Sequence, residues 1–484
     1  MEFEPRVLDA EPVTSLQSWV DAGGRRGLQA ALDGGPGPTI DAVAASGLRG
    51  RGGAGFPTAT KWRTVAANLS EELPASVVVN AAEGEPGSFK DRAILLANPY
   101  RVLEGALIAA VTIGADEVVI ATKSRWTEVI DRVRAAAAEL NAASWAEGVT
   151  IDVVGGPEEY LFGEETALLE VIEGRMPFPR LAPPWRRGID DAVGDSALSG
   201  DEELAVSDEE TPVPPVLVNN VETMANLPAI LALGADWFRS VGTLKSPGTL
   251  VCTITGDTAR HGVAEVPMGT PLRQVIEEVG GGVLRGAEPS AVLSGVSNPL
   301  IPSTMLDTPL SYEAMAAAGS GLGTGGYIVF DQGTDPVAVA AGVARFLSVE
   351  SCGQCTPCKQ DGVVISGLLG KVLVNQATET DLDILDRKLD TVTTGARCFL
   401  ATQQQLVVSS LLATFPDAMA AHAVGPGRGP VAEPRLIAEI ERLDPGERVV
   451  LDQRHAAKQP DWTFDAEDSG EAPADRLDQR GGEA

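Results

Sequence analysis

Apolar residues in the first half of the chain switch repeatedly between helical and strand spacing. Residues 58–69 place Trp62, Val65 and Leu69 on one helical face, and Thr58 is the expected N-cap. Helices are predicted over about 38–46, 91–113 and 126–141, and strands at 76–80, 117–122 and 149–154. This alternation predicts an α/β layer architecture with a largely parallel sheet.

The second half of the chain shows two other patterns. Short apolar runs between residues 247 and 330 alternate with one helix, which indicates a small α+β domain, and nearly every segment from 334 to 423 has helical spacing. The predicted domains are an α/β domain over 1–240, a small domain over 245–332, a helical domain over 335–425, and an acidic, partly disordered tail over 426–484.

Charge and composition narrow the class of protein. Hydrophobic residues make up 44% of the 484 positions, which is enough for several packed domains. The net charge of −31 would repel nucleic acid and anionic membranes, so neither is expected as a partner. No apolar run reaches the roughly 18 to 20 residues of a membrane span, and the first residues do not resemble a signal peptide. We expect a cytoplasmic protein with a mobile acidic loop at about 187–211.

A glycine-rich stretch, GLRGRGGAGFPTATKW at residues 47–62, contains the spacing G-x-G-x-x-G. An ordinary dinucleotide-binding turn follows a strand and has an acidic residue about 20 positions later, whereas the segment before this stretch is a predicted helix ending at Gly47. The glycines, with Arg51 and Lys61 nearby, favour either an anion-binding backbone in front of a helix or a plain surface loop.

Cysteine spacing gives the clearest chemical signal. Cys352, Cys355 and Cys358 follow C-x2-C-x2-C, and Cys398 lies further along the chain. Three close thiolates and a distant fourth suit a [4Fe–4S] cluster, whereas zinc sites usually take two separated pairs; zinc and free thiols remain as alternatives. Cys252 lies in a predicted strand and is expected to be a core residue.

Four motifs in fixed order resemble one known family. They are GLRGRGGAGFPTATKW, NAAEGEPGSFKDR, YLFGEETALLEVIEG with PRLAPPW and VNNVET after it, and ESCGQCTPCK with the later Cys398. Together, over about residues 22–425, they resemble the flavin-bearing, NADH-oxidising subunit of respiratory complex I (the 51 kDa or F subunit) and its relatives in NAD-linked hydrogenases and formate dehydrogenases. The resemblance implies a modified Rossmann-like FMN/NADH domain, a ubiquitin-like β-grasp domain and a C-terminal helical bundle carrying the cluster.

The resemblance also implies the cofactors and the residues that bind them. FMN, NAD(H) and one [4Fe–4S] cluster are expected. The residues implied for FMN and the glycine loop are Gly50, Arg51, Gly52, Gly53, Lys61, Asn80, Tyr160, Gly163, Glu164, Asn219, Asn220 and Thr223. Those implied for NADH are Phe56, Glu83, Glu85, Glu165 and Trp185, and those implied for the cluster are Cys352, Cys355, Cys358 and Cys398. Glu164 and Glu165 open a predicted helix, so simple helix capping is an alternative role for them.

The implied reaction is transfer of hydride from NADH to FMN and of single electrons to the cluster. Glu83 and Glu85 are expected to position the nicotinamide and ribose and to disfavour NADPH by their charge. The implied partners are a small thioredoxin-like [2Fe–2S] subunit and a larger iron–sulfur subunit with quinone as final acceptor, as in complex I. One alternative is the NAD-reducing module of a soluble formate dehydrogenase or hydrogenase.

Three departures from the family pattern suggest a second alternative, a flavin-free scaffold or electron-relay subunit. Ala82 stands where an aspartate is usual, which removes a carboxylate expected near the flavin. Thr64 stands where relatives often have a second adenine-stacking phenylalanine, and the acidic loop at 187–211 is longer than expected.

Overall fold

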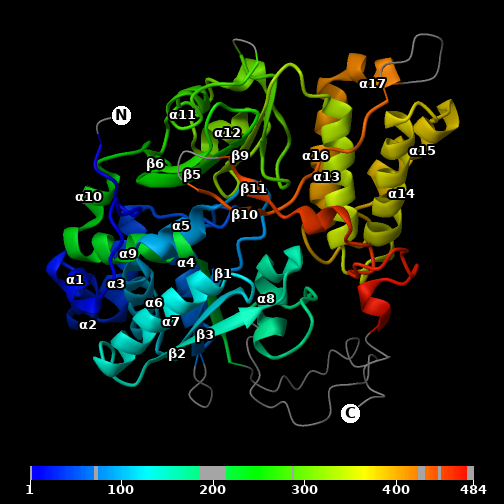
Figure 1. The fold of residues 1–484 in the computed structure, drawn as a ribbon. Coiled ribbons are helices and arrows are strands. Elements are labelled where there is room, and N and C mark those ends of the chain that lie inside the picture. The colour runs from blue at the N-terminus through cyan, green and yellow to red at the C-terminus, as the bar shows by residue number, and fades with distance from the viewer. Residues whose placement is uncertain are drawn as a thin grey trace.

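The computed structural model describes residues 3–69, 75–185, 214–285, 288–422, 431–444 and 448–476. The predicted acidic loop at 187–211 lies outside these residues. The described chain forms an α/β domain, a second domain around a mixed sheet and a group of helices (Figure 1).

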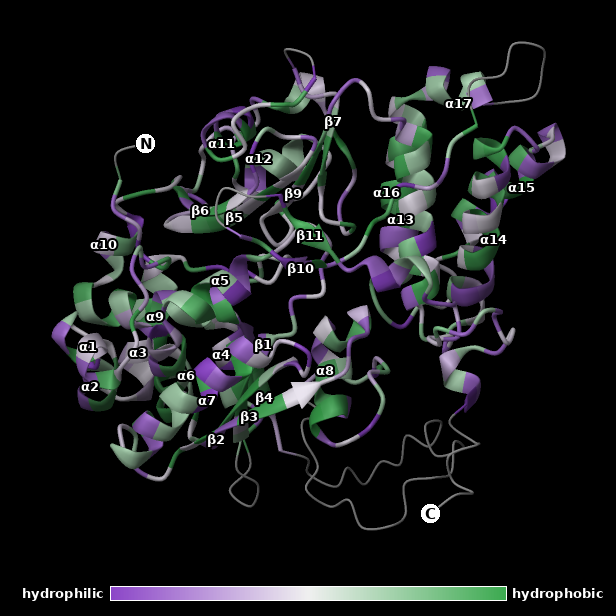
Figure 2. Ribbon diagram, in the orientation of Figure 1, coloured by the Kyte–Doolittle hydropathy of each residue, from purple (hydrophilic) through white to green (hydrophobic). Residues whose placement is uncertain are grey.

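The first domain is built on a four-stranded parallel sheet, as predicted. Its strands, in the order β3-β2-β1-β4, are β1 (Ala75–Ala81), β2 (Ala115–Lys123), β3 (Thr150–Gly156) and β4 (Val216–Asn220). Because side chains alternate along a strand, Val77 and Val79 enter one buried core and Val78 enters another, on the other face of the sheet. Figure 2 shows these strands largely in the colour of hydrophobic residues.

Helices cover both faces of this sheet. They are α1 (Leu16–Asp21), α2 (Arg26–Gly34), α3 (Pro36–Ser46), α4 (Thr58–Ala66), α5 (Lys90–Ala97), α6 (Pro99–Ile113), α7 (Thr127–Ala142), α8 (Glu165–Ile172), α9 (Val221–Leu233) and α10 (Ala235–Arg239). The helix predicted over 91–113 is two helices, because Asn98 caps α6 and Pro99 begins it. The predicted N-cap at Thr58 is wrong by one position: Pro57 occupies it without a side-chain cap.

The second domain has a five-stranded mixed sheet in the order β6-β5-β9-β7-β8. Its elements are β5 (Thr249–Gly256), β6 (Gly262–Pro267), α11 (Leu272–Glu278), β7 (Ala291–Ser294), β8 (Ile301–Pro302), α12 (Tyr312–Ala317) and β9 (Gly326–Phe330). β5 is parallel to β9, and the other pairs are antiparallel. Cys252 is fully buried in the core of this sheet, which confirms the prediction.

The next segment is helical, as predicted. Its helices are α13 (Pro336–Glu350), α14 (Thr356–Leu373), α15 (Glu379–Thr391), α16 (Leu400–Thr414) and α17 (Pro416–His422). They share one apolar core, which includes Phe346, Leu369 and Val407. Among the described residues no single helix is long and apolar enough to cross a membrane; the bent pair α5 and α6 passes that test by length and composition alone.

The expected frayed tail is the main departure from the predicted fold. Described residues after 430 form a short hairpin of β10 (Ile440–Arg442) and β11 (Val450–Leu451), and Ile437 and Ile440 are buried. This segment runs between the domains and ends beside the helices (Figure 1). Its acidic composition suggested solvation, but its carboxylates are paired with cations on other elements, as described below.

Candidate active site and iron–sulfur site

The glycine-rich loop joins α3 to α4, helix to helix, as expected from its sequence context. Gly47 adopts a left-handed conformation (φ 72°) and ends α3. The loop then folds back on itself: Arg49 bridges to Pro57, and the Gly50 amide donates a 2.8 Å hydrogen bond to the Phe56 carbonyl. Phe56 at the end of this loop is 52% exposed, so its aromatic ring is accessible at the surface.

Tyr312, from the second domain, lies against this loop. Its hydroxyl donates to the Gly50 carbonyl at 2.7 Å, and the Arg49 guanidinium lies 4.0 Å from the centre of its ring. A Cβ on Gly55 would lie 2.3 Å from the Tyr312 ring. Sequence reasoning missed Tyr312 because it lies 262 residues away from Gly50 and belongs to no motif.

Arg51 is directed into the protein. Its side chain is 1% exposed and lies 3.8 Å from the carboxylate of Glu222, while its guanidinium donates to the Pro247 carbonyl at 3.3 Å. Its backbone amide donates to Thr223 Oγ1 at 2.9 Å. The Arg51 side chain therefore ties the glycine loop to α9 and the second domain, which differs from the anion contact that we expected.

Several predicted residues meet at the carboxyl ends of β1 and β4. Asn80 and Asn220 are paired across the two parallel strands, and Asn80 Nδ2 donates to the Gly163 carbonyl at 2.8 Å. Asn219 accepts from Trp62 on α4 at 3.1 Å. A Cβ on Gly52 would lie 3.3 Å from the Asn220 Cβ. The structure thus brings segments from separate motifs together at the sheet edge where α/β folds bind ligands.

Beneath this edge lies a buried ionic group that the sequence did not reveal. Lys90 donates to Asn220 Oδ1 at 2.9 Å and pairs with Asp91 at 2.6 Å and Glu222 at 3.1 Å. Burial lowers the pKa of Lys90, but the three neighbouring carboxylates, including Glu83, outweigh it and raise that pKa overall. The lysine is therefore a fixed positive charge under Asn220.

Two acidic residues at the start of α8 have different environments. The Glu164 carboxylate caps the helix, accepting from the Thr166 and Ala167 amides at 3.0 and 2.8 Å, and burial raises its pKa. The helix-capping alternative is therefore correct for Glu164. Glu165 forms an ion pair with Lys61 of α4, and its side chain is 34% exposed. The exposed carboxylate at this site is thus that of Glu165.

Glu83 is held within its own loop. Its carboxylate accepts from the Asp91 amide at 2.8 Å and from Ser88 at 3.0 Å, and it pairs with Arg92 Nε at 2.8 Å. The backbone of Glu83 has a φ of 30°, an uncommon value for a non-glycine residue. The surrounding hydrogen bonds hold this conformation, so Glu83 shapes the loop that leads into α5.

Glu85 connects all three parts of the molecule. Oε1 accepts from the Val296 amide at 2.7 Å and from Ser297 Oγ at 3.0 Å in the second domain. Oε2 accepts from the Tyr160 hydroxyl at 2.6 Å, and that hydroxyl accepts from Gln403 of α16 at 2.7 Å. Burial raises the pKa of Glu85 and, with the Glu85 charge, that of Tyr160. Sequence reasoning identified Glu85 and Tyr160 but not Ser297 or Gln403.

The remaining predicted positions lie nearby in the first domain. Trp185 is half-buried against its core. Ala82 is fully buried beside Phe162, and its Cβ lies 4.0 Å from the point where a Cβ on Gly163 would be. Thr64 donates to the Thr60 carbonyl within α4. The two departures from the family pattern are thus accommodated without a buried unpaired polar atom at either residue.

The four predicted cluster ligands line one cavity. Cys352, Cys355, Cys358 and Cys398 line a partly open space of about 250 Å³, together with the apolar residues Leu161, Pro179 and Leu400 and the polar residues Ser351, Gln354 and Arg397. Four cysteine sulfurs around one hollow are the donor set that an iron–sulfur cluster requires, so the residues present fit the group.

The electrostatics of this cavity depend on burial, on the start of α14 and on nearby backbone amides. Burial raises the pKa of Cys352 to about 11 and that of Cys398 to about 12. The backbone offers partial compensation, because Cys355 precedes α14 and accepts from the Arg397 amide at 3.3 Å. The Ser351 hydroxyl lies 3.3 Å from Cys358 Sγ. A bound cation is what would keep these buried thiols ionised.

Three family models match the chain in the order of its domains. The Nuo51 FMN-binding domain matches residues 43–229, the SLBB domain matches 251–301, and the NADH-ubiquinone oxidoreductase-F iron-sulfur binding region matches 338–422. The last match decides between the alternatives for the cysteines, in favour of iron–sulfur over zinc or free thiols.

Known proteins resemble the chain over most of its length. The F 2 subunit of NADH-quinone oxidoreductase from Rhizobium meliloti is 34% identical over 436 residues, covering 87% of this chain and 98% of that protein. The F subunit of NADH-quinone oxidoreductase from Streptomyces coelicolor is 36% identical over 417 residues, covering 84% of this chain and 87% of that protein. A crystal structure of an NAD+-reducing [NiFe]-hydrogenase matches with a TM-score of 0.72 and 32% identity, covering 87% of this chain and 69% of that chain.

Sequence, fold and the four-cysteine cavity therefore agree. The chain belongs to the family of NADH-quinone oxidoreductase F subunits, and it is part of an oxidoreductase with FMN, NAD(H) and a [4Fe–4S] cluster as its cofactors.

Proposed function

We propose that this subunit accepts hydride from NADH and passes single electrons through its cluster to iron–sulfur partner subunits, with quinone as the final acceptor. The observation that carries the proposal is the Glu85–Tyr160–Gln403 chain of hydrogen bonds, which joins the sheet edge to the helix that follows Cys398. When bound, FMN supplies the exchange between a two-electron donor and a one-electron acceptor.

The residues around the sheet edge divide into positioning and contact groups. Asn80, Asn219 and Asn220 present amide groups from the strand ends, and we assign them to the flavin. Phe56 is exposed and Glu165 is partly exposed beside the glycine loop, and we assign them to the nucleotide. Glu83 and Glu85 are buried and fully hydrogen-bonded, so we assign them to holding the loop and the domains in place rather than to direct contact with NADH.

The cluster is assigned to Cys352, Cys355, Cys358 and Cys398, on the strength of their common cavity. In the sheet of the second domain, the first strand, β5, and the last strand, β9, are parallel neighbours. This arrangement supports the β-grasp architecture expected for the domain. A small [2Fe–2S] subunit and a larger iron–sulfur subunit remain the partners that we propose, and a cytoplasmic location remains a prediction.

The test begins with purified full-length protein. We expect a yellow flavin band, flavin fluorescence on denaturation, and NADH-dependent reduction of ferricyanide. The Cys398→Ser variant should lose iron and keep flavin, whereas Cys252→Ala, in a separate core, should keep both. Protein that contains no flavin would favour the scaffold alternative.

The second candidate function is an NAD-reducing module of a hydrogenase or formate dehydrogenase, favoured by the structural match to the NAD+-reducing hydrogenase. Native purification distinguishes the two candidates. Co-purification with membrane subunits and quinone reduction supports the first, and co-purification with a soluble hydrogenase or formate dehydrogenase subunit supports the second.

A further inference from the structure

Residues 450–476, which we call the strap, lie beyond the last residue matched by the family models, residue 422. The strap begins at β11 and continues beside α13 and α14 (Figure 1). Segments outside the matched domains are usually peripheral, but this one is bound to the α/β domain at one end and to the cysteine loop at the other.

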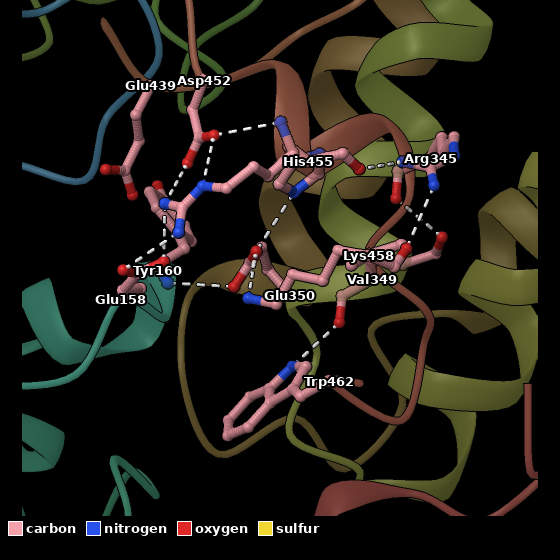
Figure 3. A network of polar contacts seen from close by, with 12 residues as sticks. Glu158, Tyr160, Arg345, Val349, Glu350, Glu439, Asp452, His455, Lys458 and Trp462 are labelled. Atoms are coloured by element: carbon pink, nitrogen blue, oxygen red, sulfur yellow. Dashed lines mark hydrogen bonds and ion pairs between the residues drawn. The ribbon is translucent and has the colours of Figure 1, made fainter. Parts of the chain in front are cut away.

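The first attachment is to Glu350 at the end of α13, two positions before Cys352. Glu350 Oε1 accepts from His455 Nε2 at 3.1 Å and from Lys458 Nζ at 2.8 Å, and Oε2 accepts from the Tyr160 amide at 2.9 Å (Figure 3). The side chains of His455, Lys458 and Glu350 are all at least nine-tenths buried. The strap therefore neutralises a carboxylate that also orients the backbone of Tyr160.

A second set of bonds fixes the strap along α13. The Arg345 guanidinium donates to three strap carbonyls, those of His455 at 2.9 Å, Ala456 at 2.8 Å and Lys458 at 3.0 Å. Trp462 Nε1 donates to the Val349 carbonyl at 2.9 Å (Figure 3). These bonds pair partly buried polar groups on both sides, so releasing the strap would exchange four specific hydrogen bonds for contacts with water.

The α/β domain holds the beginning of the strap. Arg125, which follows β2, pairs with both Asp452 of the strap and Glu439. Arg454 of the strap pairs with Glu158 at 2.7 Å, just before Tyr160. The strap thus spans from the loop that carries Tyr160 to the cysteine loop.

The far end of the strap covers the cysteine loop directly. The Ala474 amide donates to the Cys352 carbonyl at 2.9 Å, and Lys359 Nζ donates to the Pro460 carbonyl. Gly353 fits against Ala472 so closely that a Cβ on the glycine would lie 2.3 Å from the Ala472 Cβ. Only glycine at 353 permits this approach, since its φ is also positive, at 89°.

One buried carboxylate folds the strap back so that residues 472–474 reach the loop. Asp461 is 1% exposed and accepts from the amides of Thr463 at 2.9 Å and Ser469 at 3.2 Å. It also pairs with Arg476 at 2.7 Å. The turn is therefore ordered by its own ion pair and hydrogen bonds as well as by contact with the helices.

We propose that the strap is a built-in cover for the iron–sulfur site, which retains the cluster and shields it from solvent on the side of Cys352. The proposal goes beyond electron transfer and rests on the assignment of the four cysteines as cluster ligands. Opening the cysteine loop requires breaking the Ala474 and Lys359 bonds, so the strap raises the free energy of that local opening.

The test uses full-length protein and two variants. A stop codon at position 459 removes the covering part and keeps His455 and Lys458. Ala474→Pro removes the single amide that bonds Cys352, and Ala474→Ser keeps that amide as the matched control. Iron release to a ferrous chelator under anaerobic conditions should be roughly tenfold faster in both variants than in the unaltered protein, and unchanged in the control.

Cysteine labelling gives a readout that does not need the cluster. In iron-free protein, iodoacetamide should modify Cys352 faster in the two variants, while Cys252, buried in the second domain, serves as the internal reference. Unchanged iron release and unchanged Cys352 labelling in Ala474→Pro would overturn the proposal, even if the truncated chain does not fold. Full-length protein without iron would instead overturn the cysteine assignment, and labelling would still decide whether the strap covers Cys352.

Discussion

The Tyr160 hydroxyl donates a 2.6 Å hydrogen bond to Glu85 Oε2 and accepts one of 2.7 Å from Gln403 Nε2. Glu85 belongs to the α/β domain, and Gln403 belongs to the helix that follows Cys398. The contact also extends to the second domain, because Glu85 accepts from the Val296 amide. Tyr160 and Glu85 together therefore join three parts of the molecule at the site where a nucleotide and an iron–sulfur cluster are expected to exchange electrons.

Removing this hydroxyl should destabilise the protein. The Tyr160→Phe variant leaves Glu85 Oε2 and Gln403 each without a buried partner, and we expect a loss of about 1–3 kcal/mol in the free energy of unfolding. Denaturant titration followed by circular dichroism measures this loss. Tyr100→Phe is the control: its hydroxyl donates to Glu139 at 3.0 Å, a residue near the surface, so a smaller loss is expected. Equal losses of stability in Tyr160→Phe and Tyr100→Phe would contradict this prediction.

The buried carboxyl of Glu85 should make stability depend on pH. Burial raises its pKa above the ordinary 4.5, so the folded protein keeps this proton to a higher pH than the unfolded chain does. Above pH 4.5 the folded state therefore binds more protons, and this group's contribution to the free energy of unfolding falls as the pH rises. Glu85→Gln removes the titration, so its stability relative to the unaltered protein should rise as the pH increases above 4.5.

The carboxyl of Glu313 serves as a control, because its effect on stability should change with pH in the opposite direction. Burial raises the pKa of Glu313, but hydrogen bonds from Ser246 and Thr243 outweigh it and lower that pKa overall. The Glu313 carboxylate therefore stabilises the fold at pH values above the usual pKa range of carboxyl groups, and this stabilisation is lost as the pH falls. The stability lost in Glu313→Gln should be largest near neutral pH and should shrink toward acid. The same trend in both variants would contradict the assignment for Glu85.

The glycine at position 55 should not tolerate a side chain. Its φ is 63°, and a Cβ would lie 2.3 Å from the Tyr312 ring. We expect Gly55→Ala to cost about 1–3 kcal/mol of stability and to weaken flavin retention, because the loop must move off Tyr312. Gly114→Ala is the matched control, since Gly114 has a similar φ of 74° but no atom within 4 Å of the point where a Cβ would be. Thermal unfolding and flavin content measure both effects, and equal behaviour of the two variants would contradict the prediction.

Nucleotide choice should depend on Glu165 and not on Glu83. Glu165 is 34% exposed, and although it pairs with Lys61 its carboxylate remains at the site and opposes the 2′-phosphate of NADPH, so Glu165→Gln should raise the ratio of kcat/KM for NADPH to that for NADH. The Glu83 and Arg92 side chains form an ion pair and are each at most 3% exposed. Glu83→Gln would leave the buried Arg92 charge without its partner, so we expect a loss of about 3–5 kcal/mol in the free energy of unfolding. Ferricyanide assays and thermal unfolding distinguish these outcomes; a changed NADPH ratio in Glu83→Gln alone would reverse the assignment.

Much of the fold could be predicted from local pattern. The strand at 76–80 and its neighbours were visible as short apolar runs, and Gly47 marked a helix end through its conformational freedom. The break at Asn98 was missed, since apolar spacing continues through it while the cap depends on one side chain. The prediction for the C-terminal segment was wrong because its many charged residues suggested exposure to water. In the folded protein the segment is held by an ion pair with Arg125 and by hydrogen bonds from Arg345.

The amino-acid sequence by itself determined the order of the elements, the four cysteines and the motifs that place amide and carboxylate groups at strand ends, because each depends on residues close together in the chain. Tertiary structure alone decided that Arg51 and Glu83 are buried in ion pairs, that Tyr312 and Gln403 complete the site, and that the strap reaches Cys352. Those roles depend on which distant groups desolvate a charge or satisfy a hydrogen bond, and such partners meet only after the domains have packed.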